Sequence, residues 1–376
     1  MQAASRVAQV SVPGFVDHHA HLLKAAAGVP LSATPQQVRE FHHRVAGQGR
    51  TPMDVLDPAG ALSAPGLPDR LAAGLATAAA AGLVEVTEMG MRSWAYLDAL
   101  AELQRAGPLP CRVRIYVASG LATEASLDEL DARREHCGGW LRLEGVKFYA
   151  DGWLVPRTCA LSDEFADSAD RGVLFTDAEG LARQVEPLVK RGWRIATHAI
   201  GDRAVRTVLD AYDLVFGGDH AAIAAAAPRV EHASVLSTDL VARLAESGVV
   251  ACIQPSFALT DAAQLDPALG SERARHAYPW ADLAGAGVRM LAGSDYPIEL
   301  LEPLPGLTRL VTGRSARHGF AAEGSAPRQA RLTPATAFAL MTDRAAGETV
   351  LSADPRAVDP AEIDLISVLG TRPAPF

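Results

Sequence analysis

The sequence has few cysteines, and their spacing excludes a disulfide framework. Only four occur among 376 residues, at Cys111, Cys137, Cys159 and Cys252, and none of them forms a CxxC pair. Scattered thiols in this number are typical of proteins from a reducing compartment. We therefore expect a cytoplasmic protein.

The chain also lacks an excess of positive charge and long apolar runs. Lys and Arg number 35 against 44 Asp and Glu, a net charge of -9, which argues against a nucleic-acid partner. The first 15 residues contain one arginine and no apolar core of a secretory signal. The alanine-rich stretch 71–86 is interrupted by Gly and Thr, so no membrane partner is expected either.

No GxGxxG motif follows the first predicted strand, and no strand-to-helix turn reads as a P-loop. Short apolar, β-branched runs do recur, and most are near-continuous, as in strands buried on both faces of a parallel sheet. They predict strands at 11–19, 82–90, 111–119, 143–151, 193–201, 228–234, 249–256 and 288–296. Amphipathic segments between them predict helices at 93–107, 176–192, 202–218, 237–248, 279–287 and 333–347.

Eight strands that alternate with helices predict an α/β fold, a (β/α)8 TIM barrel, with a doubly wound open sheet as the competing fold. Three longer segments, 24–66, 256–278 and 299–332, each follow the end of a strand. Segments of this length in a compact domain are usually functional, and we expect them to wall the mouth of the barrel.

Polar side chains fall at the carboxyl ends of these predicted strands, and in a barrel those ends share one face. His19 and His21 form an HxH pair, whose spacing places both rings on one side of a strand, while His18 points the other way and reads as structural. Taken alone, an HxH pair is a weak signal of a metal site.

The other strand-end residues also have ordinary explanations. Lys147, in "GVKFYADG", is either a snorkelling lysine or one whose lowered pKa lets it react with CO2 to give an anionic carbamate ligand. His198 and His232 could each be a hydrogen-bonded buried histidine, and Asp295 a turn residue. Four histidines, one lysine and one aspartate at five strand ends, in one strand phase, nevertheless favour a metal site.

These motifs resemble the amidohydrolase superfamily of metal-dependent hydrolases. "PGFVDHHAH", Lys147, His198, His232 and Asp295 match its signature, and the match covers roughly residues 12–347. Finer details resemble its YtcJ-like branch, which includes N-substituted formamide deformylases. They are "RTCAL", "THAIGDRAV", "RVEHAS", "IQPSF", "YPWADLAGAGVRMLAGSDYPIE" and "LTPATAFALMT".

The resemblance implies a domain organisation. Members of this branch usually carry a β-sandwich beside the barrel and a larger insertion after the first strand than residues 24–66 provide. We therefore expect a barrel domain over residues 12–350, with residues 1–11 and 351–376 as short terminal segments that are a remnant of the side domain. The flanking β-sandwich is expected to be absent or strongly reduced.

The resemblance also implies one or two zinc ions, with manganese or iron as substitutes. His19, His21 and Asp295 would hold one ion, and His198 and His232 the other, with a carbamate on Lys147 bridging them. The metal would generate hydroxide at neutral pH, and Asp295 would shuttle its proton to the leaving nitrogen.

The expected reaction is hydrolysis of a C–N bond in a small amide, formamide or cyclic amide. The alternatives are deamination, ester or lactone hydrolysis or decarboxylation at the same site, or a non-catalytic binding protein. Deaminases of the superfamily generally lack the strand-4 lysine, which favours amide hydrolysis. A small molecule is the expected partner, and the expected oligomer is a homodimer.

Six further residues at or just after strand ends are candidate substrate contacts. Trp153 and Tyr296 could equally serve loop packing, and Arg157 could bind a substrate carboxylate or pair with Asp163 or Glu164. The full set is Glu88, Tyr149, Trp153, Arg157, Gln254 and Tyr296.

Overall fold

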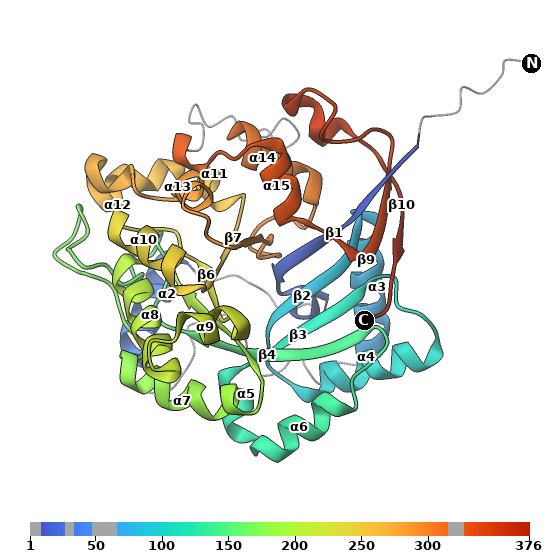
Figure 1. The fold of residues 1–376 in the computed structure, drawn as a ribbon, viewed down its shortest axis with the longest axis horizontal. Helices are drawn as coiled ribbons and strands as arrows, with labels where there is room; N and C mark the ends of the chain where they lie inside the picture. Colours follow the sequence, from blue (N-terminus) through green and yellow to red (C-terminus); the bar gives the residue numbers. More distant parts are fainter. Residues whose placement is uncertain (1–8, 27–33, 47–65, 315–326) are drawn as a thin grey trace, which may run out of the picture.

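The computed structural model describes residues 9–26, 34–46, 66–314 and 327–376. In this part of the chain, ten strands form one sheet in the order β10-β9-β1-β2-β3-β4-β5-β6-β7-β8. Helices cover the outside of the strands, as Figure 1 shows. The chain therefore has the mixed α/β architecture that the alternating pattern predicts.

Eight of the strands are parallel and follow one another in sequence order, which confirms all eight predicted strand positions. This order has no reversal of the kind that defines a doubly wound sheet. All nine residues of β2 are buried, as expected for a strand covered on both faces. The strands are β1 (Val10–Ala20), β2 (Leu83–Met91), β3 (Arg112–Ala118), β4 (Leu141–Tyr149), β5 (Arg194–Ala199), β6 (Arg229–His232), β7 (Val250–Ile253) and β8 (Met290–Ala292).

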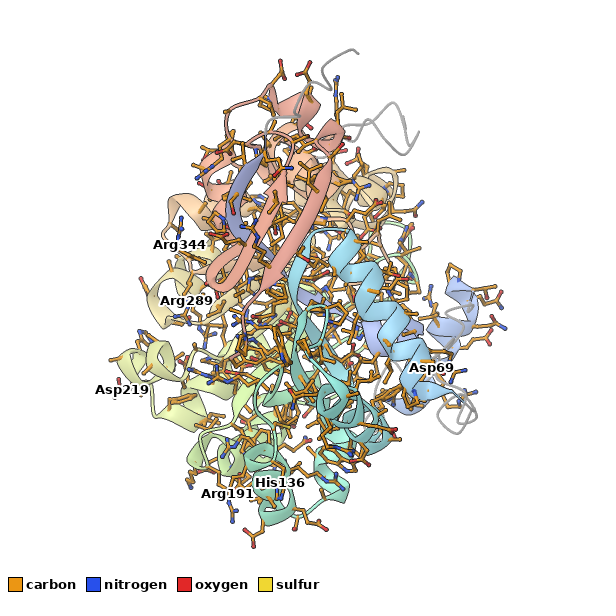
Figure 2. The ribbon with its side chains drawn as sticks, turned by 90° about the vertical axis from the view of Figure 1, so that its right-hand side faces the viewer. Asp69, His136, Arg191, Asp219, Arg289 and Arg344 are labelled. Atoms are coloured by element: carbon orange, nitrogen blue, oxygen red, sulfur yellow. The ribbon has the colours of Figure 1, made fainter. Side chains whose placement is uncertain are left out.

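The helices begin and end where local chemistry favours it. Ser93 and Asp177 accept hydrogen bonds at the starts of α4 and α7, and Gly217 ends α8 in the left-handed conformation. Charged side chains such as Asp69, Arg191 and Asp219 lie on the outer surface (Figure 2). The principal helices are α3 (Leu67–Ala80), α4 (Trp94–Ala106), α6 (Leu127–Glu135), α7 (Ala178–Lys190), α8 (Asp202–Phe216), α10 (Thr238–Ser247) and α13 (Trp280–Gly285).

The predicted helix at 333–347 is wrong in its second half. Helix α15 covers Pro334–Leu340, and the chain then forms strand β9 (Thr342–Leu351), which pairs antiparallel with β1. Pairing with the start of β1 outweighs the local helical pattern, because it satisfies that strand's free edge.

Strand β10 (Val368–Pro373) pairs antiparallel with β9, and Figure 2 shows the two as a hairpin beside the first residues of β1. Strand β9 ends at Leu351, one residue past the predicted barrel boundary at 350. The hairpin thus extends the sheet that carries β1, and the proposed division into a barrel and terminal segments stays a prediction.

The long segments that follow strands are partly helical. Segment 256–278 contains α11 (Phe257–Thr260) and α12 (Ala262–Ala274), and segment 299–332 contains α14 (Pro303–Thr312). Segment 24–66 contains α2 (Pro35–Val45), but its residues 27–33 and 47–65 lie outside the described part of the chain, as do residues 315–326. None of the described helices is both long and apolar enough to cross a bilayer.

Strands β1 and β8 meet at their carboxyl ends. The Asp295 amide donates to the His19 carbonyl at 2.7 Å, and the His21 amide donates to the Tyr296 carbonyl at 2.7 Å. The carboxylate of Asp17 accepts from both the amide and the hydroxyl of Ser294, at 2.9 and 2.5 Å. These bonds fix the residues that follow β8 against the residues that end β1.

Gly293 allows this close approach. A Cβ atom added to it would lie 2.3 Å from the His19 nitrogen and 2.6 Å from the His19 Cβ. Real Cβ atoms do not come so near to other atoms, so any side chain at residue 293 must push the two segments apart.

We predict that Gly293→Ala lowers the free energy of unfolding by about 1–3 kcal/mol, the usual cost of overpacking. Denaturant unfolding followed by circular dichroism measures this change. Gly285→Ala is the matched control, since a Cβ there meets no atom within 4 Å. Equal stabilities of the two variants would contradict the assigned role of Gly293.

Candidate metal centre

The structure gathers all six predicted metal ligands around one cavity of about 280 Å³. The His19 ring centroid lies 5.5 Å from that of His21 and 5.0 Å from that of His232. The His232 and His198 centroids are 4.5 Å apart. Strands β1, β4, β5 and β6 and the segment after β8 therefore deliver ligand-type side chains to one place, namely His19, His21, Lys147, His198, His232 and Asp295.

Each of three imidazoles is held on its outer side by a hydrogen bond. His19 Nδ1 lies 2.5 Å from the carboxylate of Glu231. A carboxylate can only accept, so Nδ1 carries the proton and Nε2 keeps its lone pair. That Nε2 faces Asp295, whose Oδ1 is 3.5 Å away.

The other two rings follow the same rule with different partners. His232 Nδ1 donates to the amide oxygen of Gln254 at 2.7 Å, and His198 Nε2 donates to the Gly152 carbonyl at 3.0 Å. The free lone pairs are then His232 Nε2 and His198 Nδ1. Metal-bound histidines in proteins almost always have such a partner on the other nitrogen, because it fixes the tautomer and the ring orientation.

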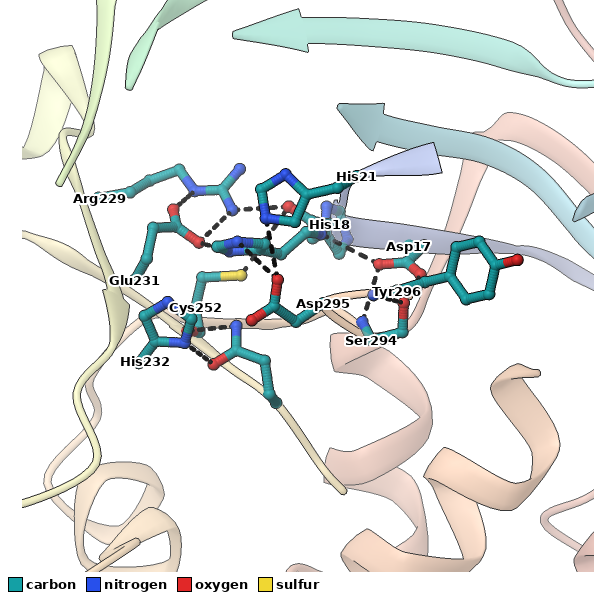
Figure 3. Close-up of polar contacts among 12 residues, drawn as sticks. Asp17, His18, His21, Arg229, Glu231, His232, Cys252, Ser294, Asp295 and Tyr296 are labelled. Atoms are coloured by element: carbon teal, nitrogen blue, oxygen red, sulfur yellow. Dashed lines mark hydrogen bonds and ion pairs between the residues drawn. The ribbon is translucent and has the colours of Figure 1, made fainter. Parts of the chain in front are cut away.

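Asp295 faces the histidines of β1. Its Oδ1 lies 3.0 Å from His21 Nε2, yet this atom has no hydrogen bond to any described residue. Figure 3 shows the His21 ring and the Asp295 carboxylate turned toward each other. Asp295 and His232 both have positive φ angles, 60° and 78°, a strained conformation for non-glycine residues that often marks functional sites.

Lys147 lies among these rings with 1% of its surface exposed. Its Nζ makes no hydrogen bond to any described residue, and lies 5.3 Å from the centroid of the Tyr149 ring. Burial lowers the pKa of Lys147 to about 8, although Glu231 and Asp295 oppose this shift. A buried amine without a hydrogen-bond partner is costly, and among the described residues this atom has none, so it is available to a further ligand.

The donor set fits a divalent metal. Burial, with the nearby Lys147 charge, lowers the pKa of His198 to about 3 and holds the pKa values of His19 and His232 far below their usual range. Neutral imidazoles and a carboxylate are the ligands that zinc, manganese and iron share. In the described part of the chain, His19, His21 and Asp295 bring one ligand atom each within 4.8 Å of one another.

A second group of three, His19, Glu231 and Cys252, has the same spacing but different chemistry. Burial raises the pKa of the Cys252 thiol well above its usual value, so the thiol stays protonated. The Glu231 carboxylate is already neutralised by Arg229, with Nε 2.7 Å from Oε1. We therefore interpret Glu231 and Cys252 as residues that hold the His19 ring in place, and not as ligands of a second metal ion.

Two of the six predicted substrate contacts, Tyr149 and Trp153, line the cavity. Glu88 does not, because its carboxylate accepts from the Leu23 amide at 2.9 Å. The Gln254 side chain is used to orient His232. Glu88 and Gln254 thus form hydrogen bonds within the protein, to the Leu23 amide and to the His232 ring. The geometry does not support the prediction that they contact substrate.

Arg157 and Tyr296 also lie outside the cavity wall. The Arg157 guanidinium pairs with Asp167 at 2.9 Å, and neither Asp163 nor Glu164 is its partner. It also donates to the carbonyls of Leu154 and Val155, so it braces the loop after β4. The Tyr296 ring points away from Asp295 (Figure 3).

Three buried carboxylates that support the ligands were missed by the sequence argument. Glu231 orients His19, and Asp17 ties Ser294 to β1. Asp151 accepts from the Ile200 and Gly201 amides at 3.0 and 2.9 Å and so fixes the turn after His198. The available signal was an acidic residue inside an apolar strand or shortly after it, one, two and four positions from a predicted ligand for Glu231, Asp17 and Asp151 respectively.

We predict that Glu231→Gln weakens metal binding about 10- to 100-fold, the usual effect of losing the outer partner of a metal-bound histidine. The amide cannot both accept from His19 Nδ1 and balance Arg229. Titration of the metal-free protein with Zn²⁺ measures the affinity. Glu85→Gln is the control, because Glu85 is another buried strand carboxylate paired with an arginine, Arg112, away from the cavity. An affinity loss of the same size in both variants would refute a specific role of Glu231.

Similar proteins point in the same direction. The chain is 29% identical over 271 residues to a Bacillus subtilis (strain 168) protein named as an amidohydrolase, YtcJ, covering 67% of this chain and 50% of that protein. It is 33% identical over 176 residues to LONG AFTER FAR-RED 3 of Arabidopsis thaliana, covering 46% of this chain and 30% of the relative. The chain thus spans half or less of the length of these curated relatives.

Two solved structures share the fold. A metal-dependent hydrolase from Pyrococcus horikoshii OT3 has a TM-score of 0.70 at 20% identity, covering 94% of this chain and 88% of its own. One from Pyrococcus furiosus has a TM-score of 0.67 at 21% identity, covering 96% and 85%. The profile of the Amidohydrolase family (Amidohydro_3) matches residues 58–353, which is more than half of the sequence. The chain therefore belongs to the Amidohydrolase family.

Proposed function

We propose that this protein is a metal-dependent amidohydrolase that hydrolyses a C–N bond of a small amide. One observation carries the proposal. Three imidazoles have their outer nitrogens bonded, and they line one cavity together with a buried lysine and a carboxylate that lack hydrogen bonds to described residues. Such a convergence of unused donors is expected for a metal centre and is costly without one.

We also infer that the eight parallel strands close as a (β/α)8 barrel. The backbone bonds between His19 and Asp295, and between His21 and Tyr296, join the first strand to the segment after the last. In that fold the carboxyl ends of the strands form the active-site face, which is where all six ligands lie.

The proposed ligand sets follow from the neighbours. His19, His21 and Asp295 would hold one zinc ion, and His198 and His232 the second. A carbamate on Lys147 would serve both, since it supplies anionic oxygen at a point where the free amine has no partner. A buried lysine of lowered pKa has a larger fraction of neutral amine, which is the form that reacts with CO2.

A bound divalent metal supplies Lewis acidity and lowers the pKa of water at the site. The chain provides the rest. Asp295 Oδ1 is the base nearest the histidines, with no competing hydrogen bond, so it can accept a proton and return it to a leaving nitrogen. The apolar residues Leu154, Ile200 and Phe257 in the cavity wall limit the access of bulk water.

We predict that Asp295→Asn lowers kcat on any accepted amide at least 10²-fold, because an amide cannot accept and return the proton. The assay is a screen of N-formyl, N-acyl and cyclic amides with added Zn²⁺ and bicarbonate, with thermal unfolding run in parallel.

Asp282→Asn is the control variant, since Asp282 is exposed on α13 and lies outside the cavity wall. Turnover by Asp295→Asn at the wild-type rate would refute the role of the carboxylate. Hydrolysis of esters or lactones without hydrolysis of any amide would instead replace the proposed bond class.

A further inference from the structure

The cavity above the proposed metal centre has two walls of different character. The segment after β4 contributes an apolar wall, and the segments after β7 and β8 contribute a wall that contains two carboxylates. The first wall consists of Trp153, Leu154, Val155 and Pro156, and the second of Phe257, Thr260, Asp261, Ile298 and Glu299.

The apolar part of the cavity reaches the surface. Val155 and Ile298 are 41% and 43% exposed, and both line the cavity. Large apolar side chains left in water at the mouth of a pocket favour a ligand that covers them. The Phe257 ring is stacked on His232 at 5.9 Å and 11°, which extends the apolar surface down to the proposed ligands. The volume of about 280 Å³ suits a small molecule such as a benzylic amide.

The two carboxylates are arranged to meet a donor. Glu299 has the neutral Thr260 hydroxyl as its hydrogen-bond partner, and the charge of Arg309 acts on it without a salt bridge among the described residues. Asp261 accepts from the Tyr278 hydroxyl at 2.5 Å, also a neutral group. Burial raises the pKa of Glu299, the Thr260 hydroxyl and the Arg309 charge oppose this shift, and the charges of Asp261 and Asp295 add to it.

The charges of Arg309 and Arg157 act on Glu299 and Asp261, but both guanidinium groups form their direct bonds with other residues. Arg157 pairs with Asp167, and the Arg309 guanidinium donates to the Ser256 hydroxyl. Lys147 is the only cationic side chain among the described residues of the cavity wall, and it lies at the proposed metal centre. Lys147 and Asp295, whose Nζ and Oδ1 atoms are deeply buried and make no hydrogen bonds to described residues, line the same cavity and mark it as a ligand site.

We propose that the preferred substrates are small amides with an apolar body whose far end carries an ammonium group, which lies against Asp261 and Glu299. This inference rests on the proposed function and names its substrate class. A carboxylate at the same end would face two like charges in a partly desolvated wall, so anionic amides are disfavoured. The apolar body lies between Trp153 and Phe257.

Three matched compounds test the proposal in the metal-loaded protein. They are N-formylbenzylamines with a para aminomethyl, methyl or carboxylate group. We expect kcat/KM to fall in that order, with at least a tenfold difference between the first and the last, mostly in KM. Equal or higher kcat/KM for the carboxylate compound would overturn the proposal.

The variant Glu299→Gln tests whether the preference for the aminomethyl compound arises from the wall that contains Asp261 and Glu299. We expect the ratio of kcat/KM for the aminomethyl and methyl compounds to fall at least fivefold in this variant. Glu246→Gln is the control, because Glu246 is exposed on α10 and outside the cavity wall, and should keep the wild-type ratio. An unchanged ratio in Glu299→Gln would overturn the assignment.

A binding measurement separates this proposal from the proposed function. Calorimetry on chelator-treated protein compares benzylammonium with benzoate, and we expect the wild-type chain to bind the ammonium more tightly and Glu299→Gln to lose that preference. If this holds while the metal-loaded protein hydrolyses no amide, the proposed function fails and the cationic subsite stands. If amides are hydrolysed but benzoate binds as well as benzylammonium, the subsite is wrong and the function stands.

Discussion

The structure of the site depends on the carboxylate of Glu231, which lies on β6 and bonds to the predicted ligand His19 on β1. It accepts from His19 Nδ1 and pairs with Arg229, whose guanidinium also donates to the His18 carbonyl at 2.7 Å. Burial raises the pKa of this carboxyl, but Arg229 and Lys147 outweigh burial and hold the pKa below its usual value. The carboxylate is therefore ionised, and its charge fixes the proton of His19 on the outer nitrogen.

Hydrogen bonds of the same kind hold other ligands around the cavity. Buried polar groups are normally bonded, and three of the histidine ligands have an outer partner from a neighbouring element: Glu231 for His19, Gln254 for His232 and the Gly152 carbonyl for His198. Asp17 and Gly293 act on the backbone, holding the segment with Asp295 against β1. Lys147 and Asp295, whose Nζ and Oδ1 atoms make no hydrogen bond to a described residue, line the cavity.

The sequence was sufficient to predict the eight strands and the residues that meet at the site. It was insufficient to predict the hydrogen-bond and ion-pair partners of the residues around the ligands. Near-continuous apolar runs predicted the eight parallel strands. The position of His19 and Asp295 at strand ends was enough to predict that they lie close together. Local patterns could not show that β9 replaces the end of a helix, since this depends on pairing with β1. Nor could they show that Arg157 turns to Asp167 or that Gln254 serves His232, because those partners are set by tertiary packing.

A crystal structure of the protein loaded with Zn²⁺ in the presence of bicarbonate tests the central claim most directly. Anomalous scattering at the zinc edge locates the ions, and the electron density at Lys147 shows whether its Nζ carries a carbamate. The account predicts zinc between His19, His21 and Asp295, and a second ion at His198 and His232 bridged by modified Lys147. Zinc bound away from these residues, or no zinc in a fully folded chain, would contradict it.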